Sequence, residues 1–138
     1  MLWIVVFDTN VLISARLSTN GNPAACLALA RIGVIRSVTC EEIVREFREK
    51  LLEKFGYTEQ RAEEATNEVR MISRLVSITN TLRAVPADPD DDVVVECAVV
   101  GEATHIITGD KRHLLPLGHY QDIVIVSASD FLAFVRDQ

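Results

Sequence analysis

An uninterrupted apolar run, Leu2-Trp3-Ile4-Val5-Val6-Phe7, leads directly into the tetrad Asp8-Thr9-Asn10-Val11. A run of this length predicts a strand that is buried on both faces, as in the middle of a parallel sheet. In open α/β sheets, ligands bind just beyond the carboxyl ends of the strands. The sequence therefore predicts that Asp8 lies where a fold of this kind carries its chemistry.

The rest of the chain alternates between apolar runs and helical patterns. We expect strands at residues 2–7, 34–39, 75–79, 104–108 and 123–126. We expect helices after Asn10 and at residues 22–32, 40–54, from Thr58 onward, 91–101 and after Ser127. Strands separated by helices imply right-handed crossovers and a parallel sheet that is covered by helices on both faces. The sequence therefore predicts one α/β domain over residues 1–138, with three layers (α/β/α) and five strands in the order 3-2-1-4-5.

Local capping signals support these helices. The residues Thr39-Cys40-Glu41-Glu42 match a capping box, and Asn22-Pro23 matches an N-cap followed by the first helical residue. Thr58 is expected to cap the helix whose apolar stripe recurs at spacings of three and four residues, at Ala62, Ala65, Val69, Ile72 and Val76. Ser127 is expected to cap the last helix, with Asp130 at the reciprocal position.

The composition is that of an acidic globular protein. The chain has 138 residues, 49% of them apolar, and a formal net charge of −6. It contains neither an apolar run of the roughly 20 residues that a membrane span needs nor the basic start of a signal peptide. The negative charge argues against broad electrostatic binding of nucleic acid, but it is compatible with a local basic rim or with a metal among carboxylates.

The cysteines and histidines are scattered and form neither a CxxC pair nor an HExxH motif. This pattern argues against a disulfide framework and a zinc cage, favours a reducing cytoplasm, and makes a nitrogen-rich metal site unexpected. We interpret the cysteines and His105 as packing residues. The residues concerned are Cys26, Cys40, Cys97, His105, His113 and His119.

Four acids that are distant in sequence are expected at one edge of this sheet. The first strand delivers Asp8 and the fourth delivers Asp110. Glu46 lies in the second turn, and Asp91 in the first turn, of helices that start at the same edge. Such a cluster would be costly without a bound cation, and all-oxygen ligands suit Mg²⁺ or Mn²⁺. Such an ion supports hydrolysis of a phosphodiester. Asn10, Thr9 and Thr108 are candidate supporting groups, and Lys111, Arg112 and Arg16 are candidate phosphate contacts.

Each acid also has a purely structural interpretation. Asp8 is placed to cap the following helix, and Asp110 is placed to cap a turn over residues 111–115. At least one acid of the run 88–92 is expected to cap a helix, and Glu42 fits the capping box. Glu46 is compatible with an ordinary surface position.

The same blocks resemble the PIN domain family, and the small single-domain PIN proteins known as VapC-type toxins in particular. The resemblance rests on Phe7-Asp8-Thr9-Asn10-Val11-Leu12, on Glu46, on Asp88-Pro89-Asp90-Asp91-Asp92 and on Thr108-Gly109-Asp110. It covers nearly the whole chain, and the four blocks in order are more specific than the opening tetrad alone.

The resemblance implies a Mg²⁺- or Mn²⁺-dependent ribonuclease that cuts single-stranded RNA. The four acids of the family fall on Asp8, Glu46, Asp91 and Asp110, and its Asn/Ser/Thr position falls on Asn10 or Thr108. Asp92 is the alternative to Asp91, and Glu42 is the alternative to Glu46. The resemblance also implies a homodimer and a small antitoxin protein as partner.

Two other functions are compatible with an Asp that follows the first strand. An aspartyl-phosphate phosphatase usually has a second Asp two residues later, where this chain has Asn10. A phosphoacceptor or scaffold domain that binds Mg²⁺ would have paired acids early in the chain, and Lys111 as its late lysine. The early acidic pair is missing, so the sequence favours the nuclease.

Overall fold

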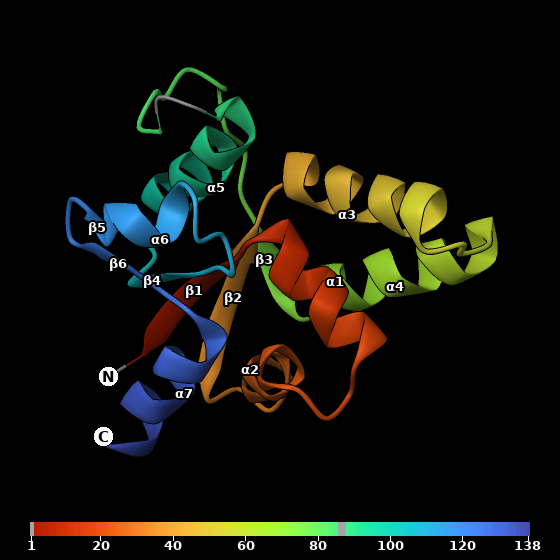
Figure 1. The fold of residues 1–138 in the computed structure, drawn as a ribbon, viewed down its shortest axis with the longest axis horizontal. Coiled ribbons are helices and arrows are strands. Elements are labelled where there is room, and N and C mark those ends of the chain that lie inside the picture. Colours follow the sequence, from red (N-terminus) through yellow and green to blue (C-terminus); the bar gives the residue numbers. More distant parts are fainter. Residues whose placement is uncertain (1, 86–87) are drawn as a thin grey trace.

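The computed structural model describes residues 2–85 and 88–138 and contains a six-stranded sheet (Figure 1). The strand order is β3-β2-β1-β4-β6-β5, and all pairs are parallel except the β5–β6 hairpin. The predicted α/β fold is thus confirmed, with β1 in the middle of the sheet. The strands are β1 Trp3–Phe7, β2 Ile35–Thr39, β3 Ser73–Leu75, β4 His105–Ile107, β5 His119–Tyr120 and β6 Ile123–Val126.

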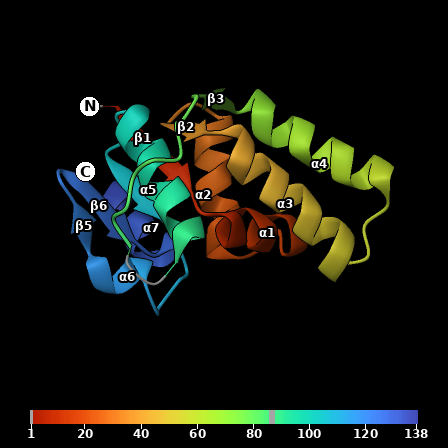
Figure 2. The same cartoon turned by 90° about the horizontal axis from the view of Figure 1, so that it is seen from above.

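Helices cover both faces of this sheet. They are α1 Thr9–Leu17, α2 Asn22–Arg31, α3 Glu41–Lys54, α4 Glu59–Met71, α5 Pro89–Val100, α6 Leu114–Leu117 and α7 Ala128–Arg136. Helix α5 packs on β1, β2 and β4 from one side, and α2 and α7 lie together on the other side. Helices α3 and α4 pack side by side and extend away from the sheet (Figure 2). Among the described residues, none of these helices is both long and apolar enough to cross a membrane.

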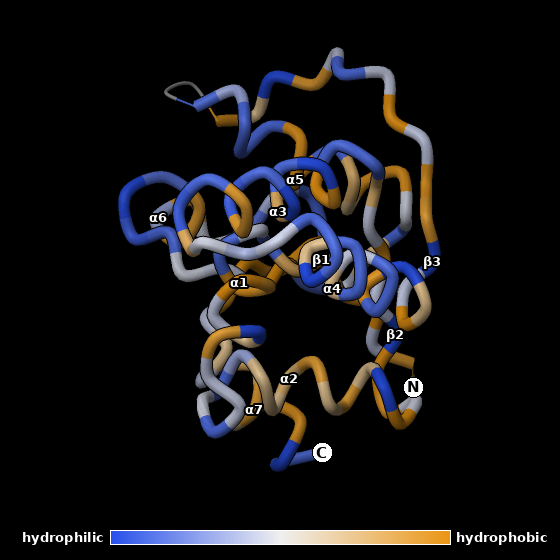
Figure 3. Tube along the Cα trace, turned by 90° about the vertical axis from the view of Figure 1, so that its right-hand side faces the viewer, coloured by the Kyte–Doolittle hydropathy of each residue, from blue (hydrophilic) through white to orange (hydrophobic). Residues whose placement is uncertain are grey.

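The strand that decides the fold is fully buried at its centre. Val5 and Val6 face opposite sides of the sheet, and each is 0% exposed. This burial on both faces is the reason why residues 2–7 show no polar alternation. In Figure 3 the turns of α3 and α4 that face the viewer are largely hydrophilic.

His105 belongs to the core, as the sequence predicts. Its ring packs against Phe131 and Phe134 of α7, with ring centroids 5.1 and 5.0 Å away, and Phe134 also packs on Trp3. Burial lowers the pKa of His105, so the neutral ring is favoured. The cluster fixes α7 against β1 and β4.

The third strand is displaced from its predicted place. It covers Ser73–Leu75 rather than residues 75–79, and Ser37 and Ser73 pair across β2 and β3 with their hydroxyls 2.7 Å apart. The backbone amides of residues 79–82 instead donate hydrogen bonds to the Glu96 carboxylate. Of these donors only the Thr79 amide belongs to the predicted strand, and its bond to Glu96 takes it out of the sheet. The third strand is thus present in its predicted place in the order, but the bounds 75–79 were wrong.

Three acids spaced four residues apart stabilise the start of α5: one caps the helix, and two hold the segment that leads into it. Asp88 accepts a hydrogen bond from the Asp90 amide and caps α5, as expected for one acid of this run. Asp92 accepts from the amides of Ala84 and Val85, each at 2.7 Å. Glu96 accepts from the amides of residues 79–82 at 2.7–3.0 Å. The segment 79–85 is thus held by side chains rather than by a ladder of backbone hydrogen bonds.

Several local predictions at element ends were wrong, and others were confirmed. The N-cap of α3 is Cys40 rather than Thr39, which stays in β2. The N-cap of α2 is Gly21 rather than Asn22, and α5 begins at Pro89 rather than at residue 91. The short edge strand β5 was missed because two residues carry no periodicity. Thr58 and Ser127 cap α4 and α7 as predicted.

Replacing Glu96 by Gln is expected to destabilise the fold by about 2–4 kcal/mol, because a buried carboxylate that satisfies four amides is lost. Burial raises the pKa of Glu96, but these amides outweigh it and hold that pKa below the ordinary 4.5. The stabilisation is therefore present above about pH 4.5 and is lost as the pH falls further. Urea unfolding of both proteins at pH 7 and pH 3 measures it, with the exposed Glu64→Gln as the matched control. If the free energy of unfolding differed equally between the two proteins at both pH values, this explanation would be contradicted.

Candidate active site

The carboxyl ends of β1 and β4 lie side by side because these strands pair in parallel. The register matches Phe7 with Ile107, and the Asp8 amide donates to the Ile107 carbonyl at 3.0 Å. Asp8 and Thr108 therefore leave the sheet at the same edge. A cleft of about 440 Å³ opens there, and all four predicted acids line it together with other polar residues: Asp8, Asn10, Glu46, Lys50, Asp88, Asp90, Asp91, Gly109, Asp110, Lys111, Arg112 and His113.

The Thr108 hydroxyl connects the first and the last acid of the cleft. It donates to Asp8 Oδ2 at 2.7 Å and accepts from the Asp110 amide at 3.0 Å. Asp8 stands at the N-cap position of α1, but this bond turns one of its oxygens toward β4. Burial raises the pKa of Asp8 above 3.8, the bond from Thr108 opposes this, and the charges of Glu46 and Asp110 add to it.

Asp91 is the most perturbed carboxyl of the cleft. The residue is 7% exposed, and its Oδ2 has no hydrogen-bond partner among the residues that the structure describes. Burial raises its pKa to about 8, helped by the neighbouring carboxyl of Asp110 and by the charges of Asp88, Asp110 and Asp8. Because burial and like charges disfavour the ionised form, Asp91 is protonated at neutral pH when no cation is bound.

Asp110 combines the structural and the candidate functional role that the sequence left open. Its carboxylate accepts from the amides of Arg112, His113 and Leu114 at 3.0–3.3 Å, so it does cap the turn that leads into α6. Burial acts to raise the pKa of Asp110, but these amides and the neighbouring carboxyl of Asp91 hold it below its ordinary value. The turn capped by Asp110 also brings His113 to the cleft.

His113 was not anticipated as a site residue. Its Nδ1 lies 3.5 Å from Asp91 Oδ2, 3.7 Å from Asp110 Oδ2 and 3.9 Å from Asp88 Oδ2. The histidines are scattered in sequence, so the sequence analysis did not place one at the acids, and a single histidine leaves the prediction that the site is not nitrogen-rich unchanged. The only available signal was its position three residues after Asp110, at the end of a capped turn.

Glu46 faces the cleft from α3 and is accompanied by a lysine that the sequence analysis also missed. Lys50 Nζ lies 3.3 Å from Glu46 Oε1 and 3.2 Å from Asn10 Oδ1. The i,i+4 spacing of Glu46 and Lys50 on one helix face was the signal for this contact. Asn10 therefore lies at the cleft, where its amide oxygen accepts from Lys50.

Four other predicted residues lie elsewhere. Asp92 turns to Ala84 and Val85, so the geometry favours Asp91 as the site acid of this run. Glu42 accepts from Asn80 Nδ2 at 3.0 Å and, with the buried Thr9, lines a neighbouring groove between α3 and α5. Arg16 is not at the acidic edge, contrary to expectation, because it pairs with Glu68 of α4.

The residues of the cleft fit a divalent cation. A buried carboxylate oxygen without a donor is unfavourable, and a cation supplies the charge that offsets it. Asp8, Glu46, Asp91 and Asp110 offer oxygen ligands of the kind that Mg²⁺ and Mn²⁺ accept. Asp88, Asp91 and His113 also have one ligand atom each within 4.8 Å of one another. The exposed Lys111 and Arg112 at the rim are placed to contact a phosphate.

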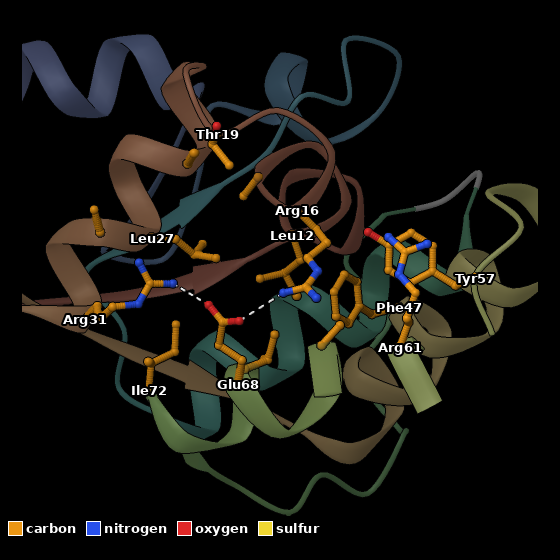
Figure 4. A pocket seen from close by; sticks show the side chains of 15 residues that line it. Leu12, Arg16, Thr19, Leu27, Arg31, Phe47, Tyr57, Arg61, Glu68 and Ile72 are labelled. Atoms are coloured by element: carbon orange, nitrogen blue, oxygen red, sulfur yellow. Dashed lines mark hydrogen bonds and ion pairs between the residues drawn. The ribbon is translucent and has the colours of Figure 1, made fainter. Parts of the chain in front are cut away.

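A second cavity, of about 460 Å³, lies between α1, α2 and α4, away from the acids (Figure 4). Its walls carry Leu12, Leu27, Phe47 and Ile72 among other apolar side chains. Glu68 lies between Arg16 and Arg31 and pairs with both, and the Arg61 guanidinium stacks 4.0 Å from the centroid of the Tyr57 ring.

Comparisons with known proteins agree with this architecture. The family model described as PIN domain matches residues 4–112. Among solved structures, the chain is similar to a chain in the crystal structure of VapBC2 from Rickettsia felis bound to a DNA fragment from their promoter. The TM-score is 0.62 and the identity 11%, over 88% of this chain and 96% of that chain, which is a likeness of fold. No curated protein sequence matches this chain.

Replacing Asp91 by Asn is expected to stabilise the metal-free protein, because Asn imitates the protonated acid. The folded pKa of about 8 lies above the ordinary 3.8, so the stability of the unmutated protein falls as the pH rises between these values. The increase in the free energy of unfolding that Asp91→Asn causes should grow from pH 4 to pH 8, to at least about 1 kcal/mol, and then level off. Thermal and urea unfolding in chelator measure it, with the exposed Asp122→Asn as control. A gain that does not change with pH would refute the raised pKa.

Proposed function

Because this chain belongs to the PIN domain family, we propose that it is a divalent-metal-dependent ribonuclease that hydrolyses single-stranded RNA. The observation that carries the proposal is the convergence of Asp8, Glu46, Asp91 and Asp110 on one cleft at the carboxyl edge of the sheet. Mg²⁺ or Mn²⁺ is the proposed cofactor. A cluster of carboxylates around one cleft favours metal-assisted hydrolysis over phosphoryl transfer to Asp8.

The residues of the cleft divide the work of such a hydrolysis. The four carboxylates would hold a cation, which would supply positive charge to stabilise the phosphate during hydrolysis. The hydroxyl of Thr108 orients Asp8 through a 2.7 Å bond, and Lys50 holds Asn10 and Glu46 at the opposite wall. Asp91 gives up its proton when a cation binds, because the cation replaces the proton as the positive partner. Lys111 and Arg112 lie where they contact the flanking phosphates of the strand.

The size and the shape of the cleft also favour single-stranded RNA. It is lined on every side by polar side chains, and no helix or ribbon projects from it into a groove of duplex nucleic acid, as judged for residues 2–85 and 88–138. An unpaired strand can place one phosphate at the carboxylates while its bases turn outward. The net charge of −6 limits binding to local contacts at this rim.

Replacing Asp8 by Asn is expected to reduce RNA cleavage at least about 100-fold, because a charged ligand of the cation is lost. The fold should survive, since the Asn oxygen still accepts from Thr108. The measurement is cleavage of unstructured RNA oligonucleotides with Mg²⁺ or Mn²⁺, with and without chelator, beside the exposed Asp137→Asn as control. Full activity of Asp8→Asn, or activity that resists chelator, would refute the proposal. Cleavage of single-stranded DNA alone would refute the choice of RNA.

We further infer that the protein acts as a VapC-type toxin with a small antitoxin protein as its partner. The similarity to VapBC2 of Rickettsia felis supports this, and the apolar cavity between α1, α2 and α4 offers a place for the partner. The cavity carries Arg16, Arg31 and Arg61 against one acid, Glu68, in a chain whose net charge is negative. This local excess of positive charge favours an apolar partner segment that carries Asp or Glu side chains. A homodimer and a cytoplasmic location stay predictions from the sequence resemblance.

Filling the cavity is expected to weaken binding of the antitoxin partner. Ala28→Trp places an indole among its apolar walls and should lower the affinity for the protein encoded in the adjacent reading frame at least about tenfold, or about 1.4 kcal/mol. Calorimetric titration measures the affinity, and the exposed Asn67→Trp on α4 is the control. RNA cleavage without the partner should be unchanged. Unaltered affinity of Ala28→Trp would exclude the cavity, and no binding by the unmutated protein would exclude this partner.

A further inference from the structure

His113 lines the acidic cleft, and its ring nitrogen Nδ1 lies within 4 Å of the carboxylates of Asp88, Asp91 and Asp110. We propose that His113 is a nitrogen ligand of the cation, that it binds together with Asp88 and Asp91, and that it makes this centre prefer Mn²⁺ over Mg²⁺. The inference rests on the proposed function, because the cation concerned is the one that the proposed nuclease uses.

The distances fit a shared ion. Two ligands that each lie about 2.1 Å from one ion are about 3–4 Å apart. His113 Nδ1 is 3.5 Å from Asp91 Oδ2 and 3.9 Å from Asp88 Oδ2. The three ligand atoms thus need only small side-chain movements to converge on one position.

An independent observation points to a cation at this place rather than to a chance cluster. Asp91 is 7% exposed, and its Oδ2 has no hydrogen-bond partner in the described part of the chain, although it is the atom nearest to His113. A buried carboxylate oxygen normally has a donor, so this oxygen is available for a ligand. The two oxygens of Asp88 have different neighbours: Oδ1 accepts a hydrogen bond from the Asp90 amide, and Oδ2 faces His113 and is available for the cation.

The backbone holds His113 in position for this role. Asp110 Oδ1 accepts from the His113 amide at 3.3 Å and from the Arg112 amide at 3.0 Å, which fixes the turn that carries the imidazole. The side chain of His113 is 30% exposed, so its ring has the cleft on one side and solvent on the other. A loop that was free to move would not keep Nδ1 within 4 Å of three carboxylates.

The nitrogen ligand is what gives the centre its selectivity. Mg²⁺ is a hard ion that favours all-oxygen ligands, whereas first-row transition ions accept imidazole readily. The four-acid set alone does not separate Mg²⁺ from Mn²⁺. The addition of one imidazole shifts the preference toward Mn²⁺, and this shift is a property of this chain's own residue at position 113.

Binding of Mn²⁺ to the metal-stripped full-length protein tests the inference without any assay of activity. Free Mn²⁺ is counted by its electron paramagnetic resonance signal, and pulsed measurements on bound Mn²⁺ detect a ¹⁴N nucleus that is directly coordinated. We expect ¹⁴N coupling in the unmutated protein and its loss in His113→Gln. Mn²⁺ affinity should fall at least about tenfold in His113→Gln, and Mg²⁺ affinity, measured by competition, should fall less.

The matched control is His119→Gln, since His119 is exposed on β5 and does not line the cleft. It should keep the ¹⁴N coupling. Circular dichroism checks that each variant is folded. If His113→Gln does not fold, the presence or absence of ¹⁴N coupling in the unmutated protein still decides whether a nitrogen coordinates the bound Mn²⁺. Mn²⁺ bound through oxygen alone, or ¹⁴N coupling that persists in His113→Gln, overturns the inference and leaves the proposed nuclease standing. No Mn²⁺ binding at all overturns the inference and also the metal dependence of the proposed function.

Discussion

The parallel pairing of β1 and β4 is the constraint on which the rest of the site depends. It places the carboxyl ends of these two strands at one edge of the sheet. There the Thr108 hydroxyl donates a hydrogen bond to Asp8, across a sequence separation of 100 residues. The same hydroxyl accepts from the Asp110 amide. A single threonine therefore sets the distance between the first and the last acid of the cleft, and the buried apolar run of β1 holds it there.

Helix α5 serves the fold and the cleft with the same stretch of acids. Asp88, Asp92 and Glu96 lie one turn apart: Asp88 caps the helix by accepting the Asp90 amide, and the other two accept backbone amides of the preceding segment. Asp91 faces Asp110 and His113. The helical period separates the two tasks, because residues 88, 92 and 96 share one face and residue 91 lies about 100° away from residue 92. Asp88 takes part in both, with one oxygen for each.

Burial of the acids in the cleft lowers the stability of the fold, and the pKa shifts that it causes are useful for catalysis. Asp8 and Asp91 are 6% and 7% exposed, and burial raises the pKa of each carboxyl. Asp110 is held ionised by the amides of the turn that it caps. Neighbouring acids with pKa values driven apart are typical of functional sites, because such strain is kept only where it is needed. The fold offsets this cost with well-satisfied acids, such as Glu96, elsewhere on the same helix.

The sequence by itself determined the α/β fold, the central place of β1, the order of the first four strands and the convergence of Asp8, Glu46, Asp91 and Asp110. These follow from apolar runs, helical periods and crossover handedness, all of which are local or topological. Only the tertiary structure decided that Asp92 bonds to Ala84 and Val85, that Arg16 pairs with Glu68, and that β3 ends at Leu75. It alone brought His113 and Lys50 to the acids. The reason is physical: which side chain satisfies a buried amide or faces a carboxylate depends on contacts between distant segments, and these contacts leave no period in the sequence.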